Sequence, residues 1–149
     1  MLVFLLASCS VFQPLDGTWL FQLDPNSKAA GDCAGDDSGG GTYLGTQSMW
    51  VDAYTLTGNQ IAFVVSSEVL TGTLTGDKVS AEYSSGYKDN TSSDTQTLTI
   101  EATLSGGSLE GTLTSVQVSK YGKNDYTCTQ TIDFTADKAT SSPDSYATH

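Results

Sequence analysis

Most of this chain alternates between apolar and polar residues with a period of two, and that alternation restricts its fold more than any other feature. In LTIEATL, residues 98–104, the even-numbered positions are apolar and the odd-numbered positions are Thr and Glu. Residues 17–23, 78–83 and 126–136 show similar alternation. A period of two is typical of an antiparallel strand with one face in a core. The sequence therefore predicts an all-β protein, and its 149 residues suit one domain.

Eight strands are expected, and short turns separate several of them. The turns carry Gly58-Asn59, Gly76-Asp77 and Gly106, which are residue types common in tight hairpin loops. Strands joined in this way form an up-and-down meander, and closing a meander into a barrel removes its exposed edges. We predict an eight-stranded antiparallel barrel, with a two-sheet β-sandwich as the alternative. The expected strands lie at 17–23, 47–57, 60–66, 68–75, 78–85, 95–105, 108–119 and 125–136.

A short phrase occurs three times in the chain. It reads LDGTW at 15–19, LTGTL at 70–74 and LEGTL at 109–113. The spacings are unequal, so the phrase does not indicate a solenoid repeat. A glycine inside a strand permits a sharp bend, and barrels need such bends to close. We therefore expect these glycines to lie where the sheet curves.

The first of these phrases also carries a family resemblance. Gly17-Thr18-Trp19 resembles the start of the first strand in lipocalin-like proteins, which commonly opens with Gly-x-Trp. The resemblance implies an up-and-down barrel in which the Trp packs across one end. It also implies a protein that binds a small apolar or amphipathic molecule.

Aromatic side chains are the candidates for lining such a barrel interior. Eight strands enclose room for side chains or for one small ligand. Plain core packing by the same residues is the alternative. The predicted ligand-binding residues are Trp19, Phe21, Trp50, Tyr54, Phe63, Tyr83, Tyr126 and Gln130.

The N-terminus carries a second resemblance, to bacterial lipoproteins. Residues 2–7 are apolar but too few to span a bilayer, and they fit the apolar region of a signal peptide that is minimal or begins upstream. The next motif, Leu6-Ala7-Ser8-Cys9, resembles the lipobox of that family. The resemblance implies that the cysteine receives diacylglycerol, that the chain is cut before it, and that its new amino group is acylated, for example with palmitate. An N-terminal strand with an ordinary cysteine is the alternative.

Lipidation at Cys9 would define the organisation of the chain. Residues 1–8 would be the signal peptide, 9–16 the lipidated cysteine and a short tether, 17–136 the barrel, and 137–149 a disordered tail. The seven residues after the cysteine reach at most about 25 Å, so the barrel is expected to stay close to the membrane. The resemblance implies a bacterial cell-envelope location, and a serine rather than aspartate at position 10 slightly favours the outer membrane.

The assignment of Cys9 leaves two further cysteines in the chain. With Cys9 lipidated, Cys33 and Cys128 remain as an even pair in an oxidising compartment, and we predict that they form a disulfide. Two separate thiols or a metal-binding pair are the alternatives. A metal pair is poorly supported because no further His or Cys lies near either residue in the sequence.

Charge and residue inventory exclude several functions. The chain has 17 acidic residues against 6 lysines and no arginine, so it cannot present the basic stripe that nucleic acids require. Its lone histidine, His149, lies in the expected tail, which leaves no Ser-His-Asp or Cys-His arrangement. Glu82, Glu101 and Glu110 fall on the solvent face by alternation. We therefore expect no enzyme activity and no cofactor.

The segment 24–42 is long, patternless and acidic. Asp32, Asp36 and Asp37 offer oxygen atoms of the kind that Ca²⁺ prefers, but their spacing matches no calcium loop and a solvated acidic loop explains them equally well. We expect no metal site. The leading hypothesis is a lipid-anchored envelope protein that binds a small apolar or amphipathic ligand. The alternative is a non-enzymatic interaction module with a filled core, which contacts another protein through its sheet face or its acidic loop.

Overall fold

The computed structural model describes residues 15–26, 28–33 and 48–139, and these residues form strands and turns without any helix. Within that part of the chain, no helix has the length and apolar character needed to cross a membrane. The strands are β1 (Gly17–Leu23), β2 (Lys28–Gly31), β3 (Ser48–Thr55), β4 (Gln60–Val65), β5 (Glu68–Thr75), β6 (Lys78–Lys88), β7 (Ser92–Ser105), β8 (Ser108–Tyr121) and β9 (Asn124–Lys138).

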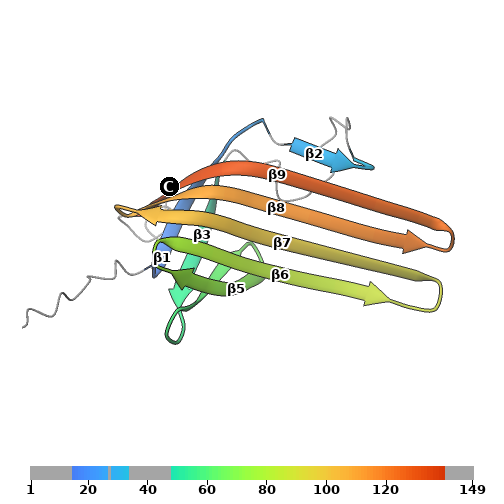
Figure 1. The fold of residues 1–149 in the computed structure, drawn as a ribbon, viewed down its shortest axis with the longest axis horizontal. Coiled ribbons are helices and arrows are strands. Elements are labelled where there is room, and N and C mark those ends of the chain that lie inside the picture. The colour runs from blue at the N-terminus through green and yellow to red at the C-terminus, as the bar shows by residue number, and fades with distance from the viewer. Residues whose placement is uncertain (1–14, 27, 34–47, 140–149) are drawn as a thin grey trace, which may run out of the picture.

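Eight of the strands close into an antiparallel barrel (Figure 1). The sheet runs β1-β3-β4-β5-β6-β7-β8-β9, and β1 then pairs with β9 from Trp19↔Lys138 to Leu23↔Phe134. The prediction of an eight-stranded, lipocalin-like barrel is therefore confirmed over the β-sandwich. The ninth strand, β2, pairs with β9 further along, at Lys28↔Thr131.

The inner faces of the strands meet in one hydrophobic core. Trp19, Phe21 and Phe63 are each at most 1% exposed, and the Phe21 ring stacks on Phe134 with 4.4 Å between ring centroids. The Trp19 indole N–H donates to the carbonyl oxygen of Leu15 at 2.8 Å, so its one polar atom is satisfied inside the core. Large side chains thus fill the centre of the barrel.

Two glycines of the recurring phrase lie where neighbouring strands approach most closely. A Cβ atom on Gly72 would lie 1.9 Å from the Ser80 carbonyl oxygen, and one on Gly111 would lie 2.1 Å from the Glu101 carbonyl oxygen. Both residues belong to the inner face, in line with Leu70 in β5 and with the core residues of β8. The backbones can meet at these points because no side chain separates them.

Four strands continue well beyond the barrel. Strands β6 to β9 have 11, 14, 14 and 15 residues, whereas β1 and β3 to β5 have between 6 and 8. The pairing of β5 with β6 ends at Glu82, and β1 leaves β9 at Phe134. Beyond these points residues 83–88, 92–98, 115–121 and 124–131 form an open four-stranded sheet, the extension, which projects to the right in Figure 1.

The extension corrects the predicted strand limits. The sequence placed 86–94 in a connection, whereas β6 runs to Lys88 and β7 starts at Ser92. Both faces of these segments meet solvent, so polar residues occupy both and the period of two disappears from the sequence. The predicted patternless segment 24–42 likewise contains β2, whose four residues are all exposed.

Asp89 holds together the turn at the end of the β6–β7 hairpin. Its carboxylate accepts the backbone N–H groups of Thr91 at 2.7 Å and Ser92 at 2.6 Å, and the hydroxyl of Tyr87 at 3.1 Å. These hydrogen bonds favour the charged carboxylate, and they hold the pKa of Asp89 well below its ordinary value of 3.8.

Acid is therefore expected to loosen this turn only at low pH. A lowered folded pKa gives a stabilising contribution that is complete above the ordinary value of 3.8 and is lost as the pH falls through the folded pKa. We expect Asp89→Ala to speed amide hydrogen exchange at Thr91 and Ser92 at neutral pH, measured by NMR. Asp77→Ala, in the β5–β6 turn, is the control and leaves these amides unchanged. Equal protection in the Asp89 variant would contradict the assignment.

Candidate functional site

The predicted ligand-binding residues do not line one cavity. Trp19, Phe21 and Phe63 lie in the packed core, and Tyr83 packs against its edge. The other four predicted residues, Trp50, Tyr54, Tyr126 and Gln130, lie outside this core.

Trp50 and Tyr54 lie on the outside of the barrel. Val51 and Ala53, their neighbours in β3, are fully buried, so the alternation turns Trp50 and Tyr54 outward. Their side chains are 46% and 48% exposed. Neither can contribute to a ligand cavity inside the barrel in this structure.

Tyr126 and Gln130 belong to the extension, on β9. Gln130 lies between Ser115 of β8 and Ala29 of β2 in the pairing register. Its Oε1 atom is buried and accepts no hydrogen bond within the described part of the chain. Tyr126 lies four residues nearer the tip on the same face of β9, because residues two and four apart share a face of a strand.

One face of the extension gathers tyrosines around a polar centre, and we call it the tyrosine face. It continues the inner surface of the barrel, because the alternation runs on without a break along β6 to β9. Its outermost full row joins Tyr87, Asp94, Ser119 and Tyr126 across the four strands. The tyrosine face consists of Ser85, Tyr87, Asp94, Gln96, Gln117, Ser119, Tyr121 and Tyr126.

The centre of the tyrosine face is an ordered polar cluster. Ser119 is only 3% exposed, and its hydroxyl donates a short hydrogen bond to the Asp94 carboxylate. Gln117 Nε2 lies 3.4 Å from the same carboxylate oxygen and 3.5 Å from the Ser119 hydroxyl oxygen. Three side chains from β7 and β8 thereby hold one another in place. The Asp94 carboxylate accepts its hydrogen bonds from the neighbouring strand β8.

The tyrosines around this centre remain open to solvent. Tyr87 is 63% exposed, Tyr121 59% and Tyr126 39%. Exposed tyrosines combine a large, rigid apolar ring with a hydroxyl that can donate or accept a hydrogen bond, and they are enriched in protein interfaces. The arrangement can therefore bind a partner surface.

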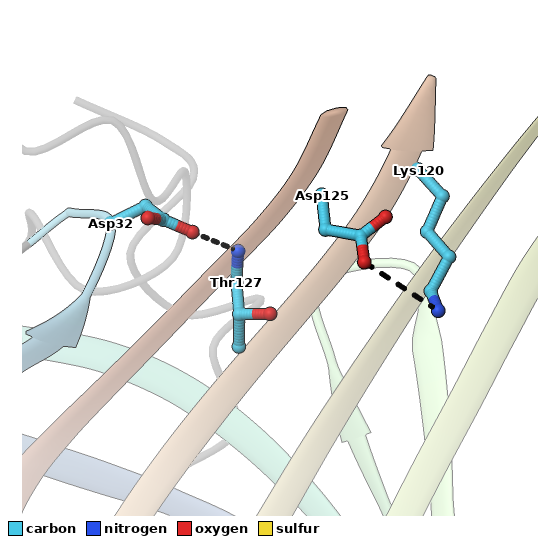
Figure 2. A network of polar contacts seen from close by, with 4 residues as sticks. All are labelled: Asp32, Lys120, Asp125 and Thr127. Atoms are coloured by element: carbon cyan, nitrogen blue, oxygen red, sulfur yellow. Dashed lines mark hydrogen bonds and ion pairs between the residues drawn. The ribbon is translucent and has the colours of Figure 1, made fainter. Parts of the chain in front are cut away.

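A disulfide and β2 brace the edge of the extension. Cys33 and Cys128 are bonded with an S–S distance of 2.03 Å, which confirms the predicted pair. Next to it, the backbone N–H of Asp32 donates to the Thr127 carbonyl at 2.7 Å. The Asp32 carboxylate in turn accepts the Thr127 N–H at 2.5 Å (Figure 2). On the opposite face from the tyrosines, Lys120 and Asp125 form an exposed ion pair at 3.9 Å.

A groove lies on the outer surface of the barrel. It is an open groove of about 980 Å³ whose lining includes Gly111 and Phe134 and the acidic residues Asp24, Glu110 and Asp133. Among the residues that the structure describes, no three His, Cys, Asp or Glu side chains come together as a metal site. The groove therefore shows an acidic surface without the geometry of a metal centre.

The remaining predicted positions are also accounted for. Glu82, Glu101 and Glu110 are exposed on the outer face, as the alternation predicts. Cys9, Asp36, Asp37 and His149 lie outside the described residues. Tyr87, Tyr121 and the Asp94–Ser119 pair were not among the residues predicted from the sequence. Their only signal was the position of tyrosines beside turns, in SGYKD and SKYGKNDYT.

Comparison with known proteins identified no relative of this chain. No family model matches the chain, and no curated protein or solved structure matches it.

Proposed function

We propose that this chain is a lipid-anchored cell-envelope protein, without enzyme activity, that binds another protein through the tyrosine face. The observation that carries the proposal is the contrast between the two ends of the inner surface. Inside the barrel, packed side chains such as Trp19, Phe21 and Phe63 occupy the space a ligand would need. On the extension, the same surface opens and presents three exposed tyrosines. This contrast favours an interaction module over a carrier of a small apolar ligand.

The lipid anchor in this proposal rests on the lipobox at Leu6-Ala7-Ser8-Cys9. The Cys33–Cys128 bond supports it, because disulfides persist in oxidising compartments such as the bacterial periplasm or the cell surface. With those two cysteines paired, Cys9 is the one left for lipidation.

The entry of the tether and the tyrosine face lie at different ends of the strands. The described chain begins at Leu15, beside the end of the barrel where Trp19 pairs with Lys138. The tyrosine face lies toward the opposite end of β9, at Tyr126. The intervening 12 residues of strand extend about 40 Å at 3.3–3.4 Å per residue. The tyrosine face is thus separated along the strands from the end of the barrel at which the tether enters.

The composition of the tyrosine face points to a protein partner. Its only charged group is Asp94, which Ser119 and Gln117 already engage. Uncharged hydrogen-bonding groups between exposed aromatic rings are the usual make-up of an interface centre, where charged residues are depleted. Tyrosines are also among the residues whose truncation costs most binding energy.

Site-specific crosslinking in cells tests the proposal. A photoreactive amino acid at Tyr121 is expected to trap a defined protein, whereas the same group at Thr95, exposed on the opposite face of β7, is expected not to trap it. The trapped protein is then purified and its affinity measured. The triple variant Tyr87→Ala, Tyr121→Ala, Tyr126→Ala is expected to bind at least about tenfold more weakly, the effect of one or two interface hot spots.

Two results would overturn this function. One is equal affinity of the purified partner for wild type and the triple variant, whose melting temperature serves as the control for folding. The other is a lipid-sized mass that remains bound in native mass spectrometry to the delipidated protein and to its Val69→Asp variant alike, since a ligand held inside the barrel would not depend on the outer surface.

A further inference from the structure

We propose that the outer face of β1 and β3 to β5 lies against the lipid surface to which the protein is anchored. This inference rests on the lipid anchoring in the proposed function, and it adds a specific membrane-contacting surface. We call that surface the apolar outer patch. It consists of Leu20, Trp50, Tyr54, Leu56, Val64 and Val69.

The strand register brings these side chains together. Leu20 of β1 lies directly opposite Trp50 of β3, and Val64 of β4 lies directly opposite Val69 of β5. Asp52 joins the two pairs, because it follows Trp50 on the same face and is paired with Val64. Directly paired residues on one face lie within side-chain contact, and diagonal ones are within reach of an aromatic ring.

The patch is unusual for an exposed surface of this protein. Trp50, Tyr54, Leu56 and Val69 each expose close to half of their surface or more. Elsewhere the outward positions are mostly Thr, Ser, Asp, Glu and Lys, as in β6 and β7. Trp and Tyr with neighbouring aliphatic residues are typical of surfaces at a membrane–water interface, where one end of each ring is apolar and the other is wet.

The place where the described chain begins supports a lipid surface as the occupant. The Asp16 carboxylate accepts a short hydrogen bond from the N–H of Thr55, and Thr55 lies between Tyr54 and Leu56 in the chain. The chain therefore enters the barrel at one end of the apolar outer patch. The seven residues between Cys9 and Gly17 span at most about 25 Å, so the lipid on Cys9 holds this end of the patch close to the bilayer.

Charge determines the kind of contact that is possible. Asp52 lies in the middle of the patch, where its carboxylate accepts the Thr18 hydroxyl at 2.6 Å. A carboxylate at that point keeps the patch in the headgroup region rather than in the hydrocarbon, because a charge is costly there. The net charge of −11 also disfavours anionic lipid, so a zwitterionic surface is the expected partner.

Tryptophan fluorescence measures this contact without an added label. The protein has two tryptophans, and Trp19 is buried in the core while Trp50 is in the patch. The lipidated protein is reconstituted into phosphatidylcholine vesicles whose headgroups do or do not carry a nitroxide, which quenches tryptophan on contact. Nitroxide-labelled lipid is expected to remove most of the Trp50 emission. Trp50→Phe, which retains only Trp19, is expected to lose none.

A charge substitution within the patch provides a second measurement. Val69→Asp is expected to reduce the quenching of Trp50, whereas Val118→Asp, on the outer face of the extension, is expected to leave it unchanged. Mass spectrometry of the same preparation first establishes whether Cys9 carries lipid. A protein without lipid overturns the anchoring itself. A lipidated, vesicle-bound protein whose emission is the same in both kinds of vesicle overturns only the membrane contact of the patch.

Discussion

Gly111→Ala is expected to lower the free energy of unfolding by about 3 kcal/mol or more, and in the extreme to prevent the barrel from closing. The added Cβ would lie 2.1 Å from the Glu101 carbonyl oxygen and 2.6 Å from the Cα of Ala102. These are backbone atoms of the neighbouring strand, which pairs with Gly111 through Ala102. They can retreat only if the sheet loses its local pairing. Gly72→Ala meets the Ser80 carbonyl in the same way and is expected to be equally damaging.

Two turn glycines serve as matched controls. Gly76 and Gly106 have φ angles of +63° and +60°, and a Cβ on either would meet no atom within 4 Å. Alanine at these positions is therefore expected to cost only the backbone strain of a left-handed residue, about 1 kcal/mol. Denaturant unfolding monitored by Trp19 fluorescence measures all four variants. Equal losses at strand and turn positions would show that close strand contact is not what requires Gly72 and Gly111.

Removing the Cys33–Cys128 disulfide is expected to lower the free energy of unfolding by about 2–5 kcal/mol. The bond joins residues 95 apart in sequence, so it removes a large amount of conformational freedom from the unfolded chain. It also secures β2, whose four residues are all exposed and which pairs only with β9 among the described strands. We therefore expect the double variant Cys33→Ala, Cys128→Ala to lose hydrogen-exchange protection in β2 before any other strand.

The first cysteine provides the control for this prediction. Cys9→Ala in the same unlipidated protein leaves the disulfide intact and is expected to leave the unfolding midpoint unchanged. An unfolding midpoint in the double variant equal to that of wild type would be inconsistent with a stabilising role for the bond. Retained protection in β2 would show that its hydrogen bonds with β9 suffice to hold it.

The barrel itself could be predicted from the sequence, because its strands have one buried and one exposed face. That difference produces the alternation at 98–104 and 126–136, which located β7 and β9. The cysteine pair was predictable by counting, once Cys9 was set aside for lipid. Burial of one strand face produced the alternation, and pairing of cysteines produced an even number of them once Cys9 was set aside.

The predicted strands 108–119 and 125–136 already covered most of the β8 and β9 part of the extension, but the ends of β6 and β7 between 86 and 94 and the whole of β2 could not be predicted in the same way. These residues are mostly polar on both faces of the strand, so the sequence shows no period there. Strand β3 presented a different ambiguity. Its sequence, SMWVDAYT, has apolar residues at both sets of alternate positions, and Trp50 and Tyr54 were assigned to the interior for their aromatic character. The structure instead buries the smaller Val51 and Ala53, which pair with the large buried rings of Trp19 in β1 and Phe63 in β4.

The pairing of β1 with β9 has a consequence for the order in which the protein can form. Trp19 pairs with Lys138, so β1, which also pairs with β3, can pair with β9 only after nearly the whole domain has been synthesised. The hairpins of β6 to β9 join residues close in sequence and can assemble early. Ring closure is a distant encounter with a high loop-entropy cost, and it is expected to be the slow step. Until the last strand arrives, the edges of β1 and β8 stay open to other chains, and the pairing of β9 with both strands removes these two edges together.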